Sequence, residues 1–146
     1  MAEVKERPSL TIVRRFDAPL ERVWQACTQA QALSQWLAPS DDHVNLAAEA
    51  DVRVGGRFRI ALRTPDGEVH DVSGVYREVI PNRKLVHTWA WKSTPERESL
   101  VTMEFREAGS GTELTLRHEQ FFDEAARDRH NTGWAACLAR LPRLLA

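Results

Sequence analysis

Residues 123–146 read DEAARDRHNTGWAACLARLPRLLA, and they carry the only long helical hydrophobic pattern in the sequence. This segment follows an unbroken series of segments with the pattern of strands. At a period of 3.6 residues, one stripe of the helix collects Arg127, Asn131, Trp134, Leu138, Leu141 and Leu145. A helix with one apolar stripe must pack that stripe against another element, and the preceding strands are the available partner. We therefore expect a sheet that curls around this helix and leaves a pocket between the two.

Two residues modify the expected helix. Gly133 costs about 1 kcal/mol relative to alanine in a helix interior, which indicates a close approach of the helix to the sheet or to a ligand. Pro142 removes a helix hydrogen bond and disfavours helical geometry at Leu141, so we expect the helix to bend or fray near its end. The segment 130–138 should therefore meet the pocket, while Leu141 and Leu145 anchor the end of the helix in the core.

Composition indicates one ordinary globular domain. Of the 146 residues, 42% are hydrophobic and 28% are charged. The net charge of −1 argues against nucleic acid or an anionic membrane as the main partner, because both select basic surfaces. The N-terminus lacks the apolar core of a signal peptide, and no segment has the ~20 apolar residues of a membrane span. We therefore expect a cytoplasmic protein.

The rest of the chain is read as short elements joined by turns. We expect a flexible N-terminal arm over residues 1–9 and a single domain over residues 10–146. A first strand at Leu10–Phe16 is followed by two short helices, one after Pro19 and one around Ala30–Gln35. Further strands are expected at Val44–Ala50, Arg57–Thr64, Val69–Ile80, Lys84–Lys92, Ser99–Glu107 and Thr112–His118. The turns between them are rich in Gly, Pro and Asp, which indicates an antiparallel meander. Helices at the two ends place the chain in the α+β class.

Short motifs in a fixed order run through the whole predicted domain. They are Phe16-Asp17-Ala18-Pro19 with Val23-Trp24, Asp51–Gly56, Asp66-Gly67, Gly74–Val79 with Pro81, Lys84–Trp89, Gly111-Thr112 with Leu114, Thr115 and His118, and Gly133-Trp134 with Leu138 and Leu141. By their number and order, the sequence resembles the AHSA1-like branch of the SRPBCC, or START-like, superfamily, the branch named after the activator of Hsp90 ATPase.

This resemblance implies a helix-grip fold of the START and Bet v 1 type. In that fold a bent antiparallel sheet of six or seven strands wraps a long C-terminal helix, and two short helices follow the first strand. Relatives in the superfamily bind hydrophobic small molecules in the cavity between sheet and helix. Some branches are polyketide cyclases or aromatases, and the eukaryotic namesakes stimulate a chaperone ATPase. The resemblance thus implies a ligand-binding cavity without naming the ligand.

The inward faces of the predicted strands supply the walls of such a pocket. Strand alternation places Leu85, His87, Trp89 and Trp91 on one face, which is mainly apolar with few polar groups, as small-molecule pockets are. A solid core would show the same periodicity. We predict ligand contacts at Trp36, Phe58, Ile60, Tyr76, His87, Trp89, Met103, Phe105, His118, Asn131, Trp134 and Leu138.

Three polar members of this set have two interpretations. His87, His118 and Tyr76 each need a hydrogen-bond partner if buried, since an unsatisfied polar group costs roughly 1–3 kcal/mol. Either they orient a ligand or act as acid and base, or neighbouring groups of the core satisfy them. Asn131 either caps the stripe near the pocket mouth or is solvated. An enzyme would require at least two of His87, His118 and Tyr76 to converge on one cavity.

Other groups of residues give little indication of a functional site. The five histidines and two cysteines lack the spacings H-x-x-x-H and C-x-x-C, so no metal site is predicted. The glycines of Val54-Gly55-Gly56 do not form a dinucleotide fingerprint, so no cofactor is predicted. Cys27 and Cys137 are expected to be buried, reduced thiols. The arginines of Arg57–Arg63 alternate with apolar residues and should form a solvated outer face.

The sequence therefore predicts a binder of a small hydrophobic or aromatic molecule, without catalysis. One alternative is an enzyme of the cyclase or hydrolase type that uses the pocket histidines and tyrosine. The other is a module that contacts an Hsp90-type chaperone through an exposed apolar patch. The small ligand is the expected partner, nucleic acid and membrane are not expected, and a homodimer is compatible with the sequence.

Overall fold

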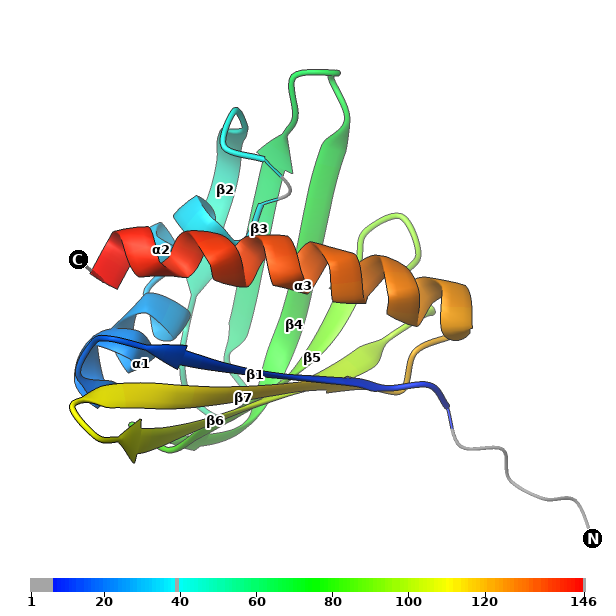
Figure 1. Ribbon diagram of the computed structural model, residues 1–146. Helices are drawn as coiled ribbons and strands as arrows, with labels where there is room; N and C mark the ends of the chain where they lie inside the picture. Colours follow the sequence, from blue (N-terminus) through cyan, green and yellow to red (C-terminus); the bar gives the residue numbers. More distant parts are fainter. Residues whose placement is uncertain (1–6, 39, 146) are drawn as a thin grey trace, which may run out of the picture.

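The computed structural model describes residues 7–38 and 40–145, and Figure 1 shows their arrangement. Strand β1 (Leu10–Phe16) precedes helices α1 (Leu20–Thr28) and α2 (Ala30–Trp36). The remaining elements are β2 (Val44–Ala50), β3 (Arg57–Arg63), β4 (Val69–Ile80), β5 (Lys84–Trp91), β6 (Ser99–Ala108), β7 (Gly111–Glu119) and α3 (Glu124–Leu145). The strand bounds predicted from alternation agree with these bounds within one residue.

All seven strands form one antiparallel sheet in the order β1-β7-β6-β5-β4-β3-β2. Strands β2 to β7 are a meander, and β1 closes the other edge by pairing with β7, with Leu10 opposite His118. The sheet bends around α3, which lies across its concave side, while α1 and α2 sit near one end of that helix (Figure 1). The α+β helix-grip fold expected from the sequence is confirmed.

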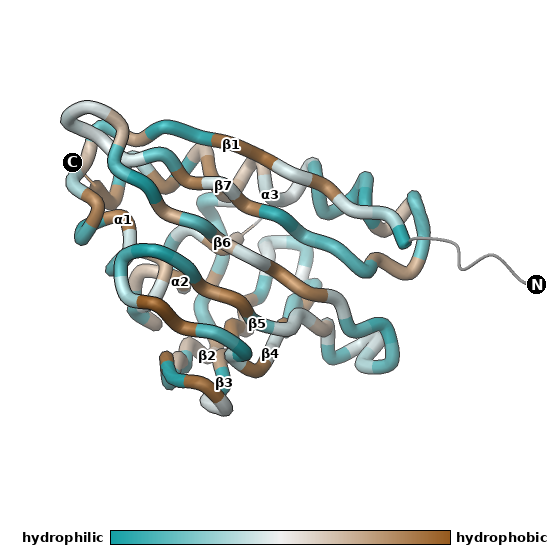
Figure 2. The backbone as a smooth tube through the Cα atoms, turned by 90° about the horizontal axis from the view of Figure 1, so that it is seen from below, coloured by the Kyte–Doolittle hydropathy of each residue, from teal (hydrophilic) through white to brown (hydrophobic). Residues whose placement is uncertain are grey.

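The core lies between the concave face of the sheet and α3. Along the strands, hydrophobic positions alternate with hydrophilic ones (Figure 2), because successive side chains point to opposite faces. In β1, for example, Leu10, Ile12 and Phe16 are buried, whereas Thr11 and Val13 are exposed. The single apolar face of the sheet thereby meets the single apolar face of the helix.

The buried face of α3 differs from the predicted stripe in its first turns. Asn131 is exposed, so its placement on the buried stripe is wrong. The helix instead turns His130 and Cys137 toward the sheet, on the other side of Trp134. The buried residues of α3 are Ala126, Trp134, Cys137, Leu138, Leu141 and Leu145. The Asp123 carboxylate fixes the start of this helix by accepting a hydrogen bond from the Ala126 amide at 2.8 Å.

At the end of α3, where a bend or fraying is expected, the structure contradicts the fraying. The helix continues through Pro142 to Leu145 without fraying. Leu141 is fully buried and Leu145 is 9% exposed, so their packing offsets the hydrogen bond that the proline cannot donate. Neither α3 nor any other helix in the described part of the chain is long and apolar enough to cross a membrane.

Candidate functional site

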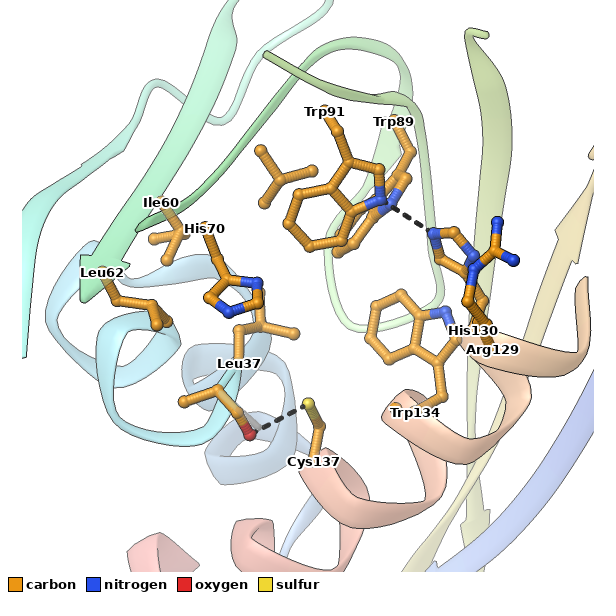
Figure 3. Close-up of a pocket in the computed structure, with 13 residues that line it drawn as sticks. Leu37, Ile60, Leu62, His70, Trp89, Trp91, Arg129, His130, Trp134 and Cys137 are labelled. Atoms are coloured by element: carbon orange, nitrogen blue, oxygen red, sulfur yellow. Dashed lines mark hydrogen bonds between the residues drawn. The ribbon is translucent and has the colours of Figure 1, made fainter. Parts of the chain in front are cut away.

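A cavity of ≈370 Å³ lies between α3 and the β3–β5 part of the sheet (Figure 3). Its size falls within the roughly 300–1,000 Å³ of small-molecule pockets. Its walls come from the segment directly after α2, from β3, β4 and β5, and from the first half of α3. The lining residues are Leu37, Ala38, Ile60, Leu62, His70, Val72, Trp89, Trp91, Arg129, His130, Gly133, Trp134 and Cys137.

Strand register builds the sheet side of this wall. Ile60 faces Val72 across the β3–β4 pair, and Leu62 faces His70. Val72 in turn faces Trp91 across the β4–β5 pair. Because all of these residues share the inward parity of their strands, three neighbouring strands contribute side chains to one continuous apolar surface.

Trp89 lies at the centre of the aromatic wall. Its ring centroid is 5.0 Å from that of Trp134 and 5.6 Å from that of Trp91, which stands at 90° to it. The side chain is 6% exposed, and its Nε1 is buried without a hydrogen-bond acceptor among the described residues. Such an unpaired donor costs roughly 1–3 kcal/mol. The wall around Trp89 is thus largely a surface of indole rings.

His130 joins the helix side of the wall to the sheet side. The Trp91 indole donates to His130 Nε2 at 2.9 Å (dashed in Figure 3), and His130 Nδ1 donates to the Ala126 carbonyl at 2.7 Å. An indole nitrogen can only donate, so Nε2 carries no proton and the ring is the neutral Nδ1–H tautomer. Burial lowers the pKa of His130, and the positive charge of Arg129 lowers it further. Both ring nitrogens are therefore used within the protein.

His118 lies behind this wall in a second hydrogen-bonded chain. The Trp134 indole donates to His118 Nδ1 at 2.9 Å, so the proton sits on Nε2, which donates to Ser99 Oγ at 2.7 Å. Ser99 Oγ then donates to the Trp89 carbonyl at 3.2 Å. The ring is fully buried, and this burial holds its pKa well below the usual value. His118 thus positions Trp134 and Trp89 but does not reach the cavity.

His87 and Tyr76 pack together in another part of the core. The His87 ring lies 4.6 Å from that of Phe58 and 5.7 Å from that of Tyr76, and its Nδ1 donates to the Thr88 carbonyl at 2.9 Å. Burial lowers the pKa of His87 to about 4 and raises the pKa of Tyr76. Neither residue lines the cavity. An enzyme of the predicted kind requires at least two of His87, His118 and Tyr76 around one cavity, and none of the three lines this one.

The structure brings only some of the predicted contact residues to the cavity. Ile60, Trp89 and Trp134 line it, and Asn131 is exposed outside it. The others are buried in the core away from the lining: Trp36, Phe58, Tyr76, His87, Met103, Phe105, His118 and Leu138. Large side chains fill the β6–β7 half of the interior, where the rings of Trp24 and Phe105 lie 5.2 Å apart. Among the described residues, the strands that line the cavity beneath α3 are therefore β3, β4 and β5.

Several lining residues are absent from the predicted ligand contacts, although the sequence places some of them at the pocket wall. Leu62 and Trp91 share the inward parity of Ile60 and Trp89, and His130 lies one helical turn before Trp134. The segment 130–138, expected to meet the pocket, also supplies Gly133 and Cys137, and the lining residues outside any prediction are Leu37, Ala38, His70, Val72 and Arg129. Residues 37 and 38 follow α2 in a segment without periodicity, so no pattern could have placed them.

Comparison with known proteins agrees with this architecture. Residues 17–146 match the family described as activator of Hsp90 ATPase homolog 1-like protein. The chain belongs to this AHSA1 family. The resemblance seen in the sequence is thus confirmed over nearly the whole domain.

Solved structures of several bacterial proteins show the same fold. A protein from Chromobacterium violaceum is 26% identical, with a TM-score of 0.83 over 94% of this chain and 96% of that one. A Rhizobium leguminosarum protein is 27% identical, with a TM-score of 0.81 over 96% and 95% of the two chains. An AHSA1-like protein from Aeromonas hydrophila shares the fold at 21% identity, with a TM-score of 0.77 over 94% and 91%. No curated protein matches the chain.

The structure tests one of the two reasons expected for Gly133 in this AHSA1-family protein, close approach of the helix to the sheet or to a ligand. A Cβ atom built at this position would meet no atom within 4 Å, so the expected close approach of helix and sheet is wrong. Gly133 nevertheless lines the cavity. The glycine therefore leaves space open at the cavity wall, and close approach to a ligand stays a prediction.

The segment after α2 that supplies Leu37 and Ala38 is tied to α3 by Arg140. Its guanidinium donates to the Ala38 carbonyl and pairs with the Asp41 carboxylate at 2.9 Å. Hydrogen bonds from Arg140 and Arg143 lower the pKa of Asp41. These contacts close the wall of the cavity next to Cys137, whose thiol also points to the Ala38 carbonyl at 3.6 Å.

Replacing Arg140 with methionine should destabilise the protein by about 2 kcal/mol. The aliphatic part of the side chain is kept, but the part-buried Ala38 carbonyl loses a charged donor, and such bonds contribute about 1.5–3 kcal/mol. Urea unfolding measures the change. Arg143→Met is the matched control, because the Arg143 side chain is 70% exposed and its ion pair with Asp41 should contribute about 1 kcal/mol or less. Equal losses in the two variants would show that Arg140 does not hold this wall.

Proposed function

We propose that the protein binds a small hydrophobic or aromatic molecule in the cavity between β3–β5 and α3. The observation that carries this proposal is the cavity itself, a ≈370 Å³ space lined mainly by apolar side chains, including three tryptophans. Apolar surface removed from water contributes roughly 25 cal/mol per Å², so a flat apolar ligand gains affinity by displacing water from this wall. Membership of a family whose fold commonly encloses such cavities supports the same function.

The chemistry of the lining favours binding over catalysis. His130 uses both ring nitrogens within the protein. Burial raises the pKa of the Cys137 thiol to about 11, so this group is neutral at physiological pH and is a poor nucleophile. His87, His118 and Tyr76 lie outside the lining. The wall therefore offers shape and apolar contact rather than a general acid and base.

Titration with N-phenyl-1-naphthylamine, a neutral aromatic probe whose emission rises in apolar surroundings, tests the proposal. We expect saturable binding of one probe per chain, with quenching of tryptophan emission, because three of the five tryptophans line the cavity. Phe122→Ser is the control for adsorption to the surface, since Phe122 is 57% exposed and lies outside the lining. It should bind the probe as the native chain does. Non-saturable binding, or binding lost in Phe122→Ser, would contradict the proposal.

A further inference from the structure

One formal charge borders the cavity. Among the lining residues, Arg129 is cationic and none is acidic. His130 is held neutral by the hydrogen bond from Trp91, and the thiol of Cys137 is neutral as well. The electrostatic character of the otherwise apolar wall is therefore set by a guanidinium at its rim, beside His130 (Figure 3).

No acidic side chain of the described residues compensates this charge. The neighbouring Asp128 pairs with Arg127 at 3.1 Å, and on the sheet side Glu68 approaches His70 at 4.0 Å. The Arg129 side chain forms no hydrogen bond or ion pair with residues 7–38 or 40–145. Its charge reaches the wall, because it adds to burial in lowering the pKa of His130. A bound molecule would thus meet, where it leaves the apolar interior, a cation that no described side chain pairs with.

We infer that the ligand is an aromatic acid whose rings lie against the tryptophans and whose anionic group meets Arg129 at the rim. This inference rests on the proposed function and deepens it. A guanidinium presents a planar fork of donors that matches a carboxylate or sulfonate in two parallel hydrogen bonds. Because Arg129 is exposed, the anion keeps part of its hydration and escapes the large penalty of a fully buried ion pair. A cationic ligand is disfavoured by the same charge.

A matched pair of probes tests the inference. N-phenyl-1-naphthylamine and 8-anilinonaphthalene-1-sulfonate share the anilinonaphthalene rings and differ by one sulfonate group. Both are titrated into the native chain, into Arg129→Gln and into Arg127→Gln, at low and at physiological ionic strength. Arg127 precedes Arg129 by two residues on the same helix but lies outside the lining, so Arg127→Gln gives the same change of net charge.

We expect Arg129→Gln to weaken sulfonate binding about tenfold, in line with the ~1.4 kcal/mol of a charge-assisted contact, and to leave binding of the neutral probe unchanged. Added salt should weaken only the sulfonate, and only when Arg129 is present. Arg127→Gln should behave as the native chain does. An equal effect of Arg129→Gln on both probes, no effect on either, or the same loss in Arg127→Gln would overturn the inference and leave the proposed function standing. If the native chain binds neither probe, the proposed function itself fails.

Discussion

Replacing Gly133 with leucine should abolish binding of N-phenyl-1-naphthylamine while leaving the protein folded. A side chain at this position starts in open space, since a Cβ would meet no atom within 4 Å, and it extends along the cavity wall. A leucine would occupy a substantial part of the ≈370 Å³ cavity and collide with a ligand rather than with the protein. We expect the dissociation constant of the probe to rise at least ~100-fold, equivalent to about 2.7 kcal/mol.

Stability should move in the opposite direction from binding. Glycine in a helix interior is less favourable than alanine or leucine by about 0.8–1 kcal/mol, so both Gly133→Ala and Gly133→Leu should raise the free energy of unfolding by up to about 1 kcal/mol. Gly133→Ala adds only one methyl group and should keep most of the probe binding. The loss of binding in Gly133→Leu is then separated from any loss of fold.

Urea unfolding and probe titration of the same samples provide both measurements. Ala139→Leu is the matched control, because Ala139 is exposed on α3 outside the lining, and the substitution adds leucine without filling the cavity. It should leave probe binding unchanged. Native-like probe binding by Gly133→Leu would place the ligand elsewhere, and a marked loss of stability would show that the space beside Gly133 is not open.

The fold could be predicted from the sequence because its elements alternate cleanly. In β3, for example, Phe58, Ile60 and Leu62 share one parity and are all buried, so the strand and its inner face follow from two-residue periodicity. Turns rich in glycine and proline mark the ends of the strands. Each hairpin then places consecutive strands side by side, and the long last helix has only one sheet to cover.

The site could be predicted less well, because periodicity gives the direction of a side chain and not the space left beside it. Phe105 has the same inward parity as Trp89, yet it packs against Trp24 in the filled half of the interior. Which half stays open depends on side-chain volumes summed over α1, α3 and the sheet. On the helix, a small rotation of the buried face exchanges Asn131 for His130, and no pattern in the sequence resolves that rotation.

Lowering the pH from 7 to 4 should destabilise the protein by several kcal/mol through its buried histidines. Burial lowers the pKa of His87 from an ordinary value near 6.5 to about 4 and lowers the pKa of His118 as well. Between these pH values the unfolded chain binds protons that the folded chain does not bind, so the free energy of unfolding rises with pH in this window. This stabilisation is fully present above about pH 6.5 and is lost as the pH falls toward 4. At about 1.4 kcal/mol per pH unit, His87 alone accounts for about 3 kcal/mol.

The hydrogen bonds of His118 explain why its ring does not take up a second proton, on Nδ1, in the folded state. Protonation of Nδ1 would place an N–H against the Trp134 indole N–H, which is 2.9 Å away and can only donate. The Trp134 side chain would then have to move, and with it the wall that it forms beside Trp89. Acid should therefore weaken probe binding in the same pH range in which it weakens the fold.

Urea unfolding at pH 7, 6, 5 and 4.5 measures the effect. The upper part of this range lies above the pH at which carboxylates ordinarily take up protons, so the histidines can be followed there. His87→Gln should be less stable at pH 7 but should show a shallower dependence on pH, because the unfolded state takes up one proton fewer than in the native chain. Two results would show that these rings do not limit stability in acid. One is a free energy of unfolding that does not change with pH in the native chain. The other is the native pH dependence in a chain that carries both His87→Gln and His118→Gln.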